Sequence, residues 1–241
     1  MGAGRGAALV TGAARRIGRA IALELARAGR DVALHARLDD AAARATLAEV
    51  EAAGVRATLL TGDLADADVA AGLVVAAAAA LGPVGLAVAN ASLYERDAAG
   101  DFAAADFDRH MAVNLRAPLM MAQALAGQGV EACFVAIVDQ RVLALTPQDF
   151  TYTLSKAALW DATRMMARAF APLVRVNAVA PGPTLANVHE GEEGLSREIA
   201  ALPLRAGPTP QEIAAAVLYL ADARSVTGQM IAVDGGQHLA G

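Results

Sequence analysis

The chain has 241 residues, 56% of them hydrophobic and only 4% aromatic, so aliphatic side chains and alanine must form its interior and a disordered chain is excluded. A formal net charge of −5 argues against a nucleic-acid partner, which requires a concentrated basic surface. The single cysteine, Cys133, excludes an intrachain disulfide and fits buried packing in a reducing compartment.

Two segments bear on where the protein works. Residues 1–6 lack the apolar core and cleavage pattern of a secretion signal, so we expect a cytoplasmic protein. Residues 69–89 carry no charge, but Gly82-Pro83 and Gly85 interrupt them. We therefore predict a helix, a turn and a strand there, and no membrane partner.

Predicted strands and helices alternate along the chain. The first strand, 7–10, ends in a glycine turn, and apolar residues at helical spacing over 17–28 follow it. A second strand at 31–36 completes a β-α-β unit. The same alternation predicts helices near 40–53, 66–80, 101–126, 151–171 and 210–221, and strands at 55–60, 86–89, 132–138, 174–179 and 229–233.

This alternation favours a mostly parallel sheet with helices on both faces, because parallel strands need crossover connections. No linker or internal repeat is visible, so we predict one domain over residues 1–241. The least regular segment is 184–208, which contains the polar run 189–194. We interpret this segment as a substrate lid, and a solvated loop is the alternative.

The turn after the first strand is typical of an anion site. Thr11-Gly12 ends the strand and the next helix opens near Gly18, so backbone N–H groups and the positive end of a helix dipole converge. Such glycines also occur in tight turns that bind nothing. The position in the first β-α turn of an alternating chain favours a bound pyrophosphate.

The end of the second strand indicates which dinucleotide binds. An acidic residue there would accept the ribose 2′-hydroxyl of NAD, but the strand ends in His35-Ala36-Arg37. Arg16 and Arg37 can instead bind a 2′-phosphate through charge-assisted hydrogen bonds of about 1.5–3 kcal/mol each. The residues favour NADPH, unless both arginines are simply solvated surface groups.

Tyr152 and Lys156 lie four residues apart on a predicted helix, so their side chains leave the same face. A neighbouring ammonium stabilises a phenolate and lowers the pKa of a tyrosine toward the working pH. The pair predicts a proton-transfer site, and the alternative is two side chains that merely lie on a helix surface.

These segments resemble the short-chain dehydrogenase/reductase family. Residues 11–18 resemble its Thr-Gly-x-x-x-Gly-x-Gly fingerprint, and Tyr152 with Lys156 resembles its catalytic pair. The resemblance implies a Rossmann-type, doubly wound α/β fold with seven parallel strands in the order 3-2-1-4-5-6-7. It also implies a homotetramer, proton donation by Tyr152, a nicotinamide ribose held by Lys156 and a relay water held by Asn114.

Further segments extend the resemblance to the rest of the chain. Asp63-Leu64 resembles the pair that contacts the adenine, Asn90-Ala91-Ser92 resembles the Asn-Ala-Gly segment, and Pro181-Gly182 with Thr184 resembles the turn that holds the carboxamide. The predicted cofactor-binding residues are Gly12, Arg16, Ile17, Gly18, His35, Arg37, Asp63, Leu64, Asn90, Ala91, Ser92, Tyr152, Lys156, Pro181, Gly182 and Thr184.

Three departures from the usual family pattern resemble the pteridine reductases. Arg16 replaces the middle fingerprint glycine, Asp139 stands where serine is usual, and Tyr94 stands where a ring stacks on the pterin. A carboxylate repels the oxyanion of a ketone substrate, but beside Tyr152 it can help protonate the nitrogen of a C=N bond. Residues 236–239 also resemble the tail of bacterial dihydromonapterin reductases.

We therefore predict an NADPH-dependent enzyme that reduces a small pteridine such as dihydromonapterin, dihydrobiopterin or dihydrofolate. The predicted catalytic residues are Asp139, Tyr152, Lys156 and Asn114, and the predicted substrate contacts are Ser92, Tyr94, Asp139 and Tyr152. A general carbonyl or 3-oxoacyl reductase of the same family is the nearest alternative, and a non-catalytic NADPH-binding regulator is the second. The alternatives for two of these residues are that Asp139 caps the next turn and that Tyr94 is an ordinary core or surface tyrosine. No metal site is predicted, because His238 has no partner cluster.

Overall fold

A computed structural model describes residues 6–186, 189 and 191–240. Seven strands form one sheet in the order β3-β2-β1-β4-β5-β6-β7, and every neighbouring pair is parallel. The predicted fold is therefore confirmed. The strands are β1 (Ala7–Val10), β2 (Val32–Ala36), β3 (Ala57–Thr61), β4 (Val84–Ala89), β5 (Ala132–Ile137), β6 (Val174–Pro181) and β7 (Met230–Val233).

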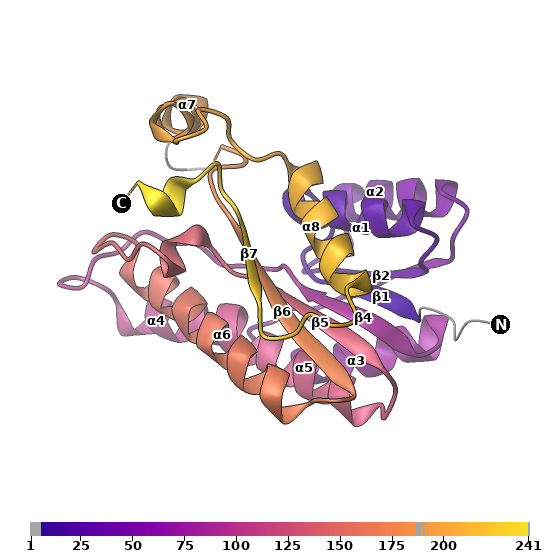
Figure 1. Cartoon of the computed structure of the whole chain (residues 1–241). Coiled ribbons are helices and arrows are strands. Elements are labelled where there is room, and N and C mark those ends of the chain that lie inside the picture. Colours follow the sequence, from indigo (N-terminus) through magenta and orange to yellow (C-terminus); the bar gives the residue numbers. More distant parts are fainter. Residues whose placement is uncertain (1–5, 187–188, 190, 241) are drawn as a thin grey trace.

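Helices cover both faces of the sheet (Figure 1). One face carries α1 (Arg16–Arg27), α2 (Ala41–Ala52) and α8 (Pro210–Asp222). The other carries α3 (Ala67–Leu81), α5 (Ala117–Gly127) and α6 (Phe150–Ala169). Successive residues of a strand point to opposite faces. Leu9 therefore packs in the layer of α3 and α5, whereas Val10 packs in the layer of α1 and α8.

The uncharged stretch 69–89 divides as predicted. It forms most of α3, a turn with Gly82 at a φ of 91°, and β4. Within the part of the chain that the structure describes, no helix is long and apolar enough to cross a membrane. Cys133 lies on β5 and is 2% exposed, in agreement with its predicted packing role.

The long helix predicted over 101–126 is interrupted. It consists of α4 (Ala104–His110), a π-helical segment (Met111–Arg116) and α5. Pro118 explains the interruption, because a proline ring has no N–H and clashes with the carbonyl four residues earlier, here that of Asn114. Asn114 is buried within this wider turn, and such π segments often occur at functional sites.

The segment 184–208 differs from the irregular loop that we expected. It contains α7 (Gly191–Ala201), which stands apart from both helix layers (Figure 1). This helix lies near the short 3₁₀ turn Gln237–Leu239 at the C-terminal end of the chain. Leu195, Ile199 and Leu202 recur at helical spacing, a signal that the acidic and glycine residues around them obscure. Residues 187, 188 and 190 of this predicted lid lie outside the described residues. The lid itself stays a prediction.

Candidate active site

Two adjoining cavities open at the carboxyl ends of the strands. The larger has a volume of about 610 Å³ and lies over β1, β2 and β4, while the smaller, of about 240 Å³, lies over β5 and β6. Ligands bind at this end of doubly wound sheets. The residues that line both cavities are Arg16, Ile17, Asn90 and Ser92.

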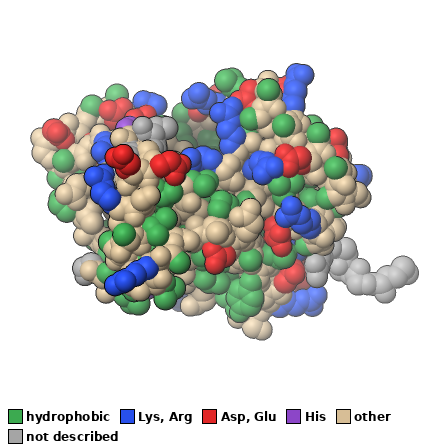
Figure 2. Space-filling model, turned by 90° about the horizontal axis from the view of Figure 1, so that it is seen from above, with side chains coloured by type: hydrophobic (Ala, Val, Ile, Leu, Met, Phe, Trp, Pro, Cys, Tyr) green, Lys and Arg blue, Asp and Glu red, His purple; other side chains and the backbone are tan. Residues whose placement is uncertain are grey.

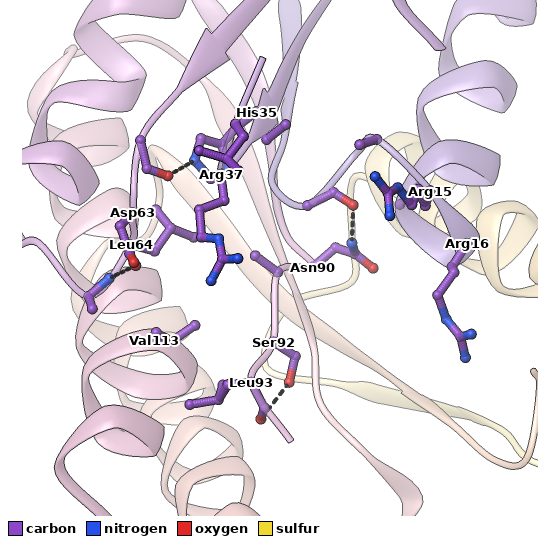
Figure 3. A pocket seen from close by; sticks show the side chains of 18 of the residues that line it. Arg15, Arg16, His35, Arg37, Asp63, Leu64, Asn90, Ser92, Leu93 and Val113 are labelled. Atoms are coloured by element: carbon purple, nitrogen blue, oxygen red, sulfur yellow. Dashed lines mark hydrogen bonds between the residues drawn. The ribbon is translucent and has the colours of Figure 1, made fainter. Parts of the chain in front are cut away.

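The turn between β1 and α1 is held close to the end of β4. The Asn90 amide donates to the carbonyls of Thr11 and Gly12 at 2.9 and 3.3 Å (Figure 3). A Cβ atom on Gly18 would lie 2.2 Å from the Gly12 oxygen, and Gly12 has a φ of 63°. Both positions therefore require glycine, which leaves the backbone of this turn open to the larger cavity.

The amino end of α1 is uncapped, unlike those of its neighbours. Asp40, Asp66 and Thr209 cap α2, α3 and α8 with side-chain oxygens, but no side chain caps α1 and its first turn carries no acidic residue. Unpaired N–H groups at a helix start favour an anion. This turn therefore fits the pyrophosphate of a dinucleotide.

The end of β2 brings positive charge to the same cavity. Arg37 is exposed and projects into the cavity beside Asp63 and Leu64 (Figure 3). The buried His35 ring bonds the Gly62 carbonyl at 3.1 Å, and burial lowers its pKa. At the end of β2, an uncharged His35 thus holds Gly62 at the edge of the larger cavity, and Arg37 places a positive charge there.

Arg16 lies apart from Arg37, contrary to our expectation that the two bind one phosphate together. Figure 3 shows Arg16 beyond Asn90, on the other side of the pocket. Its guanidinium donates to the carbonyls of Leu185 and Ala186 at 3.2 and 2.9 Å. The φ of Arg16 is 55°, in the left-handed region that few non-glycine residues adopt, and this turns its side chain toward the smaller cavity.

The surface around the larger cavity is basic. Seen from above, the molecule has a hollow between two lobes, with basic side chains along part of its border (Figure 2). Four arginines line the larger cavity: Arg15, Arg16, Arg37 and Arg109. Two carboxylates, Asp40 and Asp63, also line it, so the arginines outnumber them by four to two. Asp40 is paired with Arg15, and its pKa is lowered by the Ala43 N–H and by Arg15. The local field therefore favours an anionic ligand although the whole chain is acidic.

Tyr152 and Asp139 meet in the smaller cavity. The Tyr152 hydroxyl, on α6, donates to Asp139 Oδ2 at 2.8 Å, just beyond β5. The other carboxylate oxygen accepts the Arg141 N–H at 2.9 Å and so caps a short 3₁₀ turn. Asp139 thus caps this turn and contacts Tyr152 at the same time, while its chemical role stays a prediction.

The electrostatics of Tyr152 differ from our expectation. Burial and the Asp139 carboxylate raise the pKa of Tyr152 well above its ordinary value, and Arg141 is the cation that opposes them. The expectation that Lys156 lowers this pKa is therefore wrong for this structure. Lys156 Nζ donates to the Ile137 carbonyl at 2.9 Å, and burial lowers the lysine pKa to about 8 against the pull of Asp139.

Asn114 is fully buried and all four hydrogen-bonding positions of its amide are used. Its oxygen accepts from the Leu93 N–H at 2.8 Å and the Ser92 hydroxyl at 3.3 Å. Its nitrogen donates to the Leu93 carbonyl at 2.9 Å and to Ser155 Oγ at 3.0 Å. The amide thus joins the segment after β4 to α6. A relay water stays a prediction, and it would need another atom of Asn114, such as its carbonyl.

Tyr94 forms one wall of the smaller cavity. Its ring packs edge-on against Tyr152, with centroids 5.0 Å apart, and against His189 at 5.6 Å. Burial of this half-buried side chain raises its pKa. Its position beside Tyr152 is compatible with stacking on a substrate ring, although the stacking itself stays a prediction.

The remaining predicted residues lie around these walls. Pro181, Gly182 and Thr184 line the smaller cavity, and a Cβ atom on Gly182 would lie 2.6 Å from Asp234 Cα. Asp63, Leu64 and Ala91 line the larger one. Every residue predicted to bind cofactor or substrate lines one of the two cavities. Of the predicted catalytic residues, only Asn114 lines neither.

Comparison with known proteins identifies the family. A family model described as Enoyl-(Acyl carrier protein) reductase matches residues 12–238. L-rhamnose 1-dehydrogenase (NAD(P)(+)) of Sphingomonas sp. (strain SKA58) is 33% identical over 96% of this chain and 95% of that protein. This chain belongs to the short-chain dehydrogenase/reductase family. It is therefore an oxidoreductase.

Two solved structures are similar over almost the whole chain. FolM Alternative dihydrofolate reductase 1 from Brucella canis, complexed with NADP, is 44% identical with a TM-score of 0.91, covering 98% of this chain and 95% of that one. The protein of the same name from Brucella suis, in complex with NADP, is 44% identical with a TM-score of 0.94, covering 98% and 96%.

Sequence reasoning missed several residues of this short-chain dehydrogenase/reductase site. Arg15 lies in the fingerprint next to Arg16, but only the fold shows that it lines the cavity and pairs with Asp40. Gln140 and Arg141 directly follow Asp139 and line the smaller cavity. Their position after the fifth strand was the available signal, because side chains at strand ends face the site.

Proposed function

We propose that this protein reduces the C=N bond of a dihydropterin with NADPH. The observation that carries the proposal is the 2.8 Å hydrogen bond from the Tyr152 hydroxyl to Asp139, at the position where the family usually has serine. The solved structures named FolM alternative dihydrofolate reductase, at 44% identity, support the same substrate class. The nearby ring of Tyr94 provides a face on which a flat heterocycle can stack.

The residues of the larger cavity fit NADPH. The open amino end of α1 would hold the pyrophosphate, Arg37 with Arg15 would face the 2′-phosphate, and Asp63 with Leu64 would contact the adenine. In the smaller cavity, Pro181, Gly182, Thr184 and Lys156 would hold the nicotinamide end. When bound, NADPH supplies the hydride that reduces the substrate carbon.

Tyr152 and Asp139 would supply the proton for the substrate nitrogen. The raised pKa keeps the Tyr152 phenol protonated at neutral pH, so it serves as an acid and not as a base. Its hydroxyl is already hydrogen-bonded to the Asp139 carboxyl group. The pair can therefore pass a proton to a substrate nitrogen that lies beside the Tyr152 hydroxyl or beside the Asp139 carboxyl group. Lys156, when protonated, adds the positive charge that balances the carboxylate.

The alternative of a carbonyl reductase is less well supported. The curated relative named L-rhamnose 1-dehydrogenase acts, by its name, on a sugar, so the family includes that chemistry. A ketone oxygen becomes negative in the transition state, however, and a carboxylate at position 139 repels it where a serine hydroxyl would donate. No feature of the site favours a non-catalytic regulator, which has no use for the Tyr152–Asp139 contact.

Steady-state assays test the proposal directly. Purified protein with NADPH is expected to oxidise the cofactor in the presence of dihydromonapterin, dihydrobiopterin or dihydrofolate, and to turn over simple ketones much more slowly. Absence of turnover on all three pteridines would refute the assignment.

The Asp139→Ser variant tests the chemistry. Replacing the carboxylate by a hydroxyl is expected to lower kcat for dihydropterins by roughly 100-fold, the lower range for loss of acid catalysis, and to raise activity on ketones. Unchanged pterin turnover would contradict the role of Asp139.

Two further expectations belong to this proposal. A homotetramer would form through the outer faces of α5 and α6, and on α6 the apolar side chains of Leu154 and Met165 are exposed. Light scattering on the purified protein would measure its mass. Cytoplasmic location also stays a prediction, and fractionation of the source cells would test it.

A further inference from the structure

A third cavity adjoins the proposed substrate site, on the side away from the turn between β1 and α1. Its volume is about 480 Å³, and it shares Gln140, Arg141 and Gln237 with the smaller cavity. The catalytic residues proposed above do not line it. It is therefore an extension of the substrate pocket that the reaction itself does not need.

The wall of this cavity is polar throughout. Among the described residues it consists of three glutamines, a threonine, two arginines and two aspartates, with no aliphatic or aromatic side chain. The two positive and two negative charges cancel. Binding pockets for aromatic or aliphatic groups are lined mainly by apolar side chains, so this composition fits a neutral group rich in hydroxyls.

Gln140 is the residue of this wall that points most directly to a ligand. It is 6% exposed, and its Oε1 has no hydrogen-bond partner among the described residues. Buried polar atoms are nearly always paired, because an unpaired acceptor costs about 1–3 kcal/mol. The side-chain amide both donates and accepts, which matches a hydroxyl group.

The cavity is also joined rigidly to the proton donor. Arg141 bridges Asp139 and Asp149, with nitrogen–oxygen distances of 3.4 Å to each. Asp149 lines the cavity, is buried, and has a φ of 53°, a conformation that is costly for a non-glycine residue and concentrates at functional sites. A group bound here would therefore sit at a defined position relative to the Tyr152–Asp139 pair.

We propose that this cavity binds a short polyhydroxylated side chain on the pterin ring, with Gln140 as a specificity-determining hydrogen-bond partner. This inference rests on the proposed function. It predicts that a dihydropterin with a trihydroxypropyl chain is preferred over one with a methyl group at the same carbon. It also predicts that dihydrofolate is the poorer substrate, because its tail is aromatic and doubly negative.

The test compares kcat/KM for dihydromonapterin with kcat/KM for 6-methyldihydropterin. The wild-type ratio is expected to exceed 10, and the Gln140→Leu variant is expected to lower it about 5- to 10-fold, the effect of one lost hydrogen bond. The Gln148→Leu variant probes a second, exposed residue of the same wall, and serves if Gln140→Leu fails to fold. The matched control is Gln211→Leu, an exposed glutamine on α8, which should leave the ratio unchanged.

The outcomes separate the two proposals. Turnover of both dihydropterins with equal kcat/KM, or a ratio that neither cavity variant changes, would overturn the side-chain site and leave the proposed function intact. Turnover of neither compound would overturn the proposed function, and the side-chain site with it. A wild-type preference that Gln140→Leu or Gln148→Leu reduces, but Gln211→Leu does not, supports both.

Discussion

Lys156 shows how burial controls the charge of a single residue in this site. It is the one lysine of the sequence, and its side chain is 2% exposed. Its ammonium bonds one carbonyl, that of Ile137, and burial lowers its pKa to about 8. Near neutral pH Lys156 is thus mostly protonated, and it loses its proton when the pH rises through about 8.

We predict that kcat/KM for pterin reduction falls as pH rises through about 8, because the ammonium then loses its proton. The Lys156→Arg variant should be slower but should lack this decline, since a guanidinium stays charged. Because the chain has one lysine, a ¹⁵N-lysine label gives a single side-chain signal that measures the pKa directly. Titration of that signal near 10.5 would contradict the prediction.

Arg37 is expected to determine the preference of the enzyme for NADPH over NADH. Arg37→Ala should lower the preference for NADPH over NADH about 10- to 100-fold, because a charge-assisted bond to the 2′-phosphate is worth roughly 1.5–3 kcal/mol. Arg44→Ala is the control, since Arg44 is exposed nearby on α2 and pairs with Asp39 outside the cavity. Kd values for both nucleotides, from fluorescence titration, would measure the ratio. An equal change in the two variants would argue against this role.

At the scale of elements, a buried chain of hydrogen bonds joins the loop that carries Tyr94 to the start of α6. His110 Nε2 accepts the Glu95 N–H at 3.1 Å, so the proton of the neutral ring lies on Nδ1, which donates to Thr151 Oγ1 at 2.7 Å. The Thr151 hydroxyl in turn donates to Asp97. Burial lowers the pKa of His110, which keeps its ring neutral. This chain positions Tyr94 relative to Tyr152.

Replacing Thr151 by valine keeps its shape but removes the linking hydroxyl. We expect Thr151→Val to lower the free energy of unfolding by about 1–3 kcal/mol, because the fully buried His110 Nδ1 loses its acceptor and the partly buried Asp97 loses a donor. Thr163→Val on the same helix is the control. Its equally buried hydroxyl only bonds the Leu159 carbonyl within the helix, so the cost should stay below about 1 kcal/mol. Urea denaturation measures both, and equal losses would contradict this role.

The elements were predictable from the sequence to different degrees. The β-α alternation and the glycine turns are local signals, so the strands and most helices were predicted to within a few residues. The π-helical segment needed the effect of Pro118 on the preceding turn to be recognised. Helix α7 was missed because its apolar residues are few and lie among acidic and glycine residues.

At the scale of the whole molecule, buried titratable groups connect stability to pH. Lys156 has a lower pKa in the folded chain than its ordinary 10.5, so between pH 8 and 10.5 the unfolded chain binds more protons and stability rises with pH. The contribution of Cys133 to the change of stability with pH has the opposite sign. Burial raises its pKa from 9 to about 11, so stability falls with pH across that interval. The raised pKa of Tyr152 acts in the same direction above pH 10.

We therefore predict that the free energy of unfolding rises by on the order of 1 kcal/mol between pH 8 and 9, where only the lysine contributes strongly. Lys156→Met should abolish this rise. Cys133→Ala should leave the rise intact and weaken the decline at higher pH. Denaturant titrations at half-unit pH steps would measure these slopes, and a wild-type curve that is flat or falls from pH 8 to 9 would refute the assignment.

The amino-acid sequence was enough to predict the fold, its strand order through the family resemblance, and the residue types that face the cavities. These follow from periodicity and from motifs that lie within a few residues of each other. The folded chain was needed to show that Arg16 and Arg37 lie apart and that Arg15 is paired with Asp40. It was also needed to show that burial, followed by the Asp139 carboxylate, raises the pKa of Tyr152. The reason is physical: pKa values, pairings and cavity walls depend on burial and on contacts between residues far apart in the chain, and no local pattern encodes them.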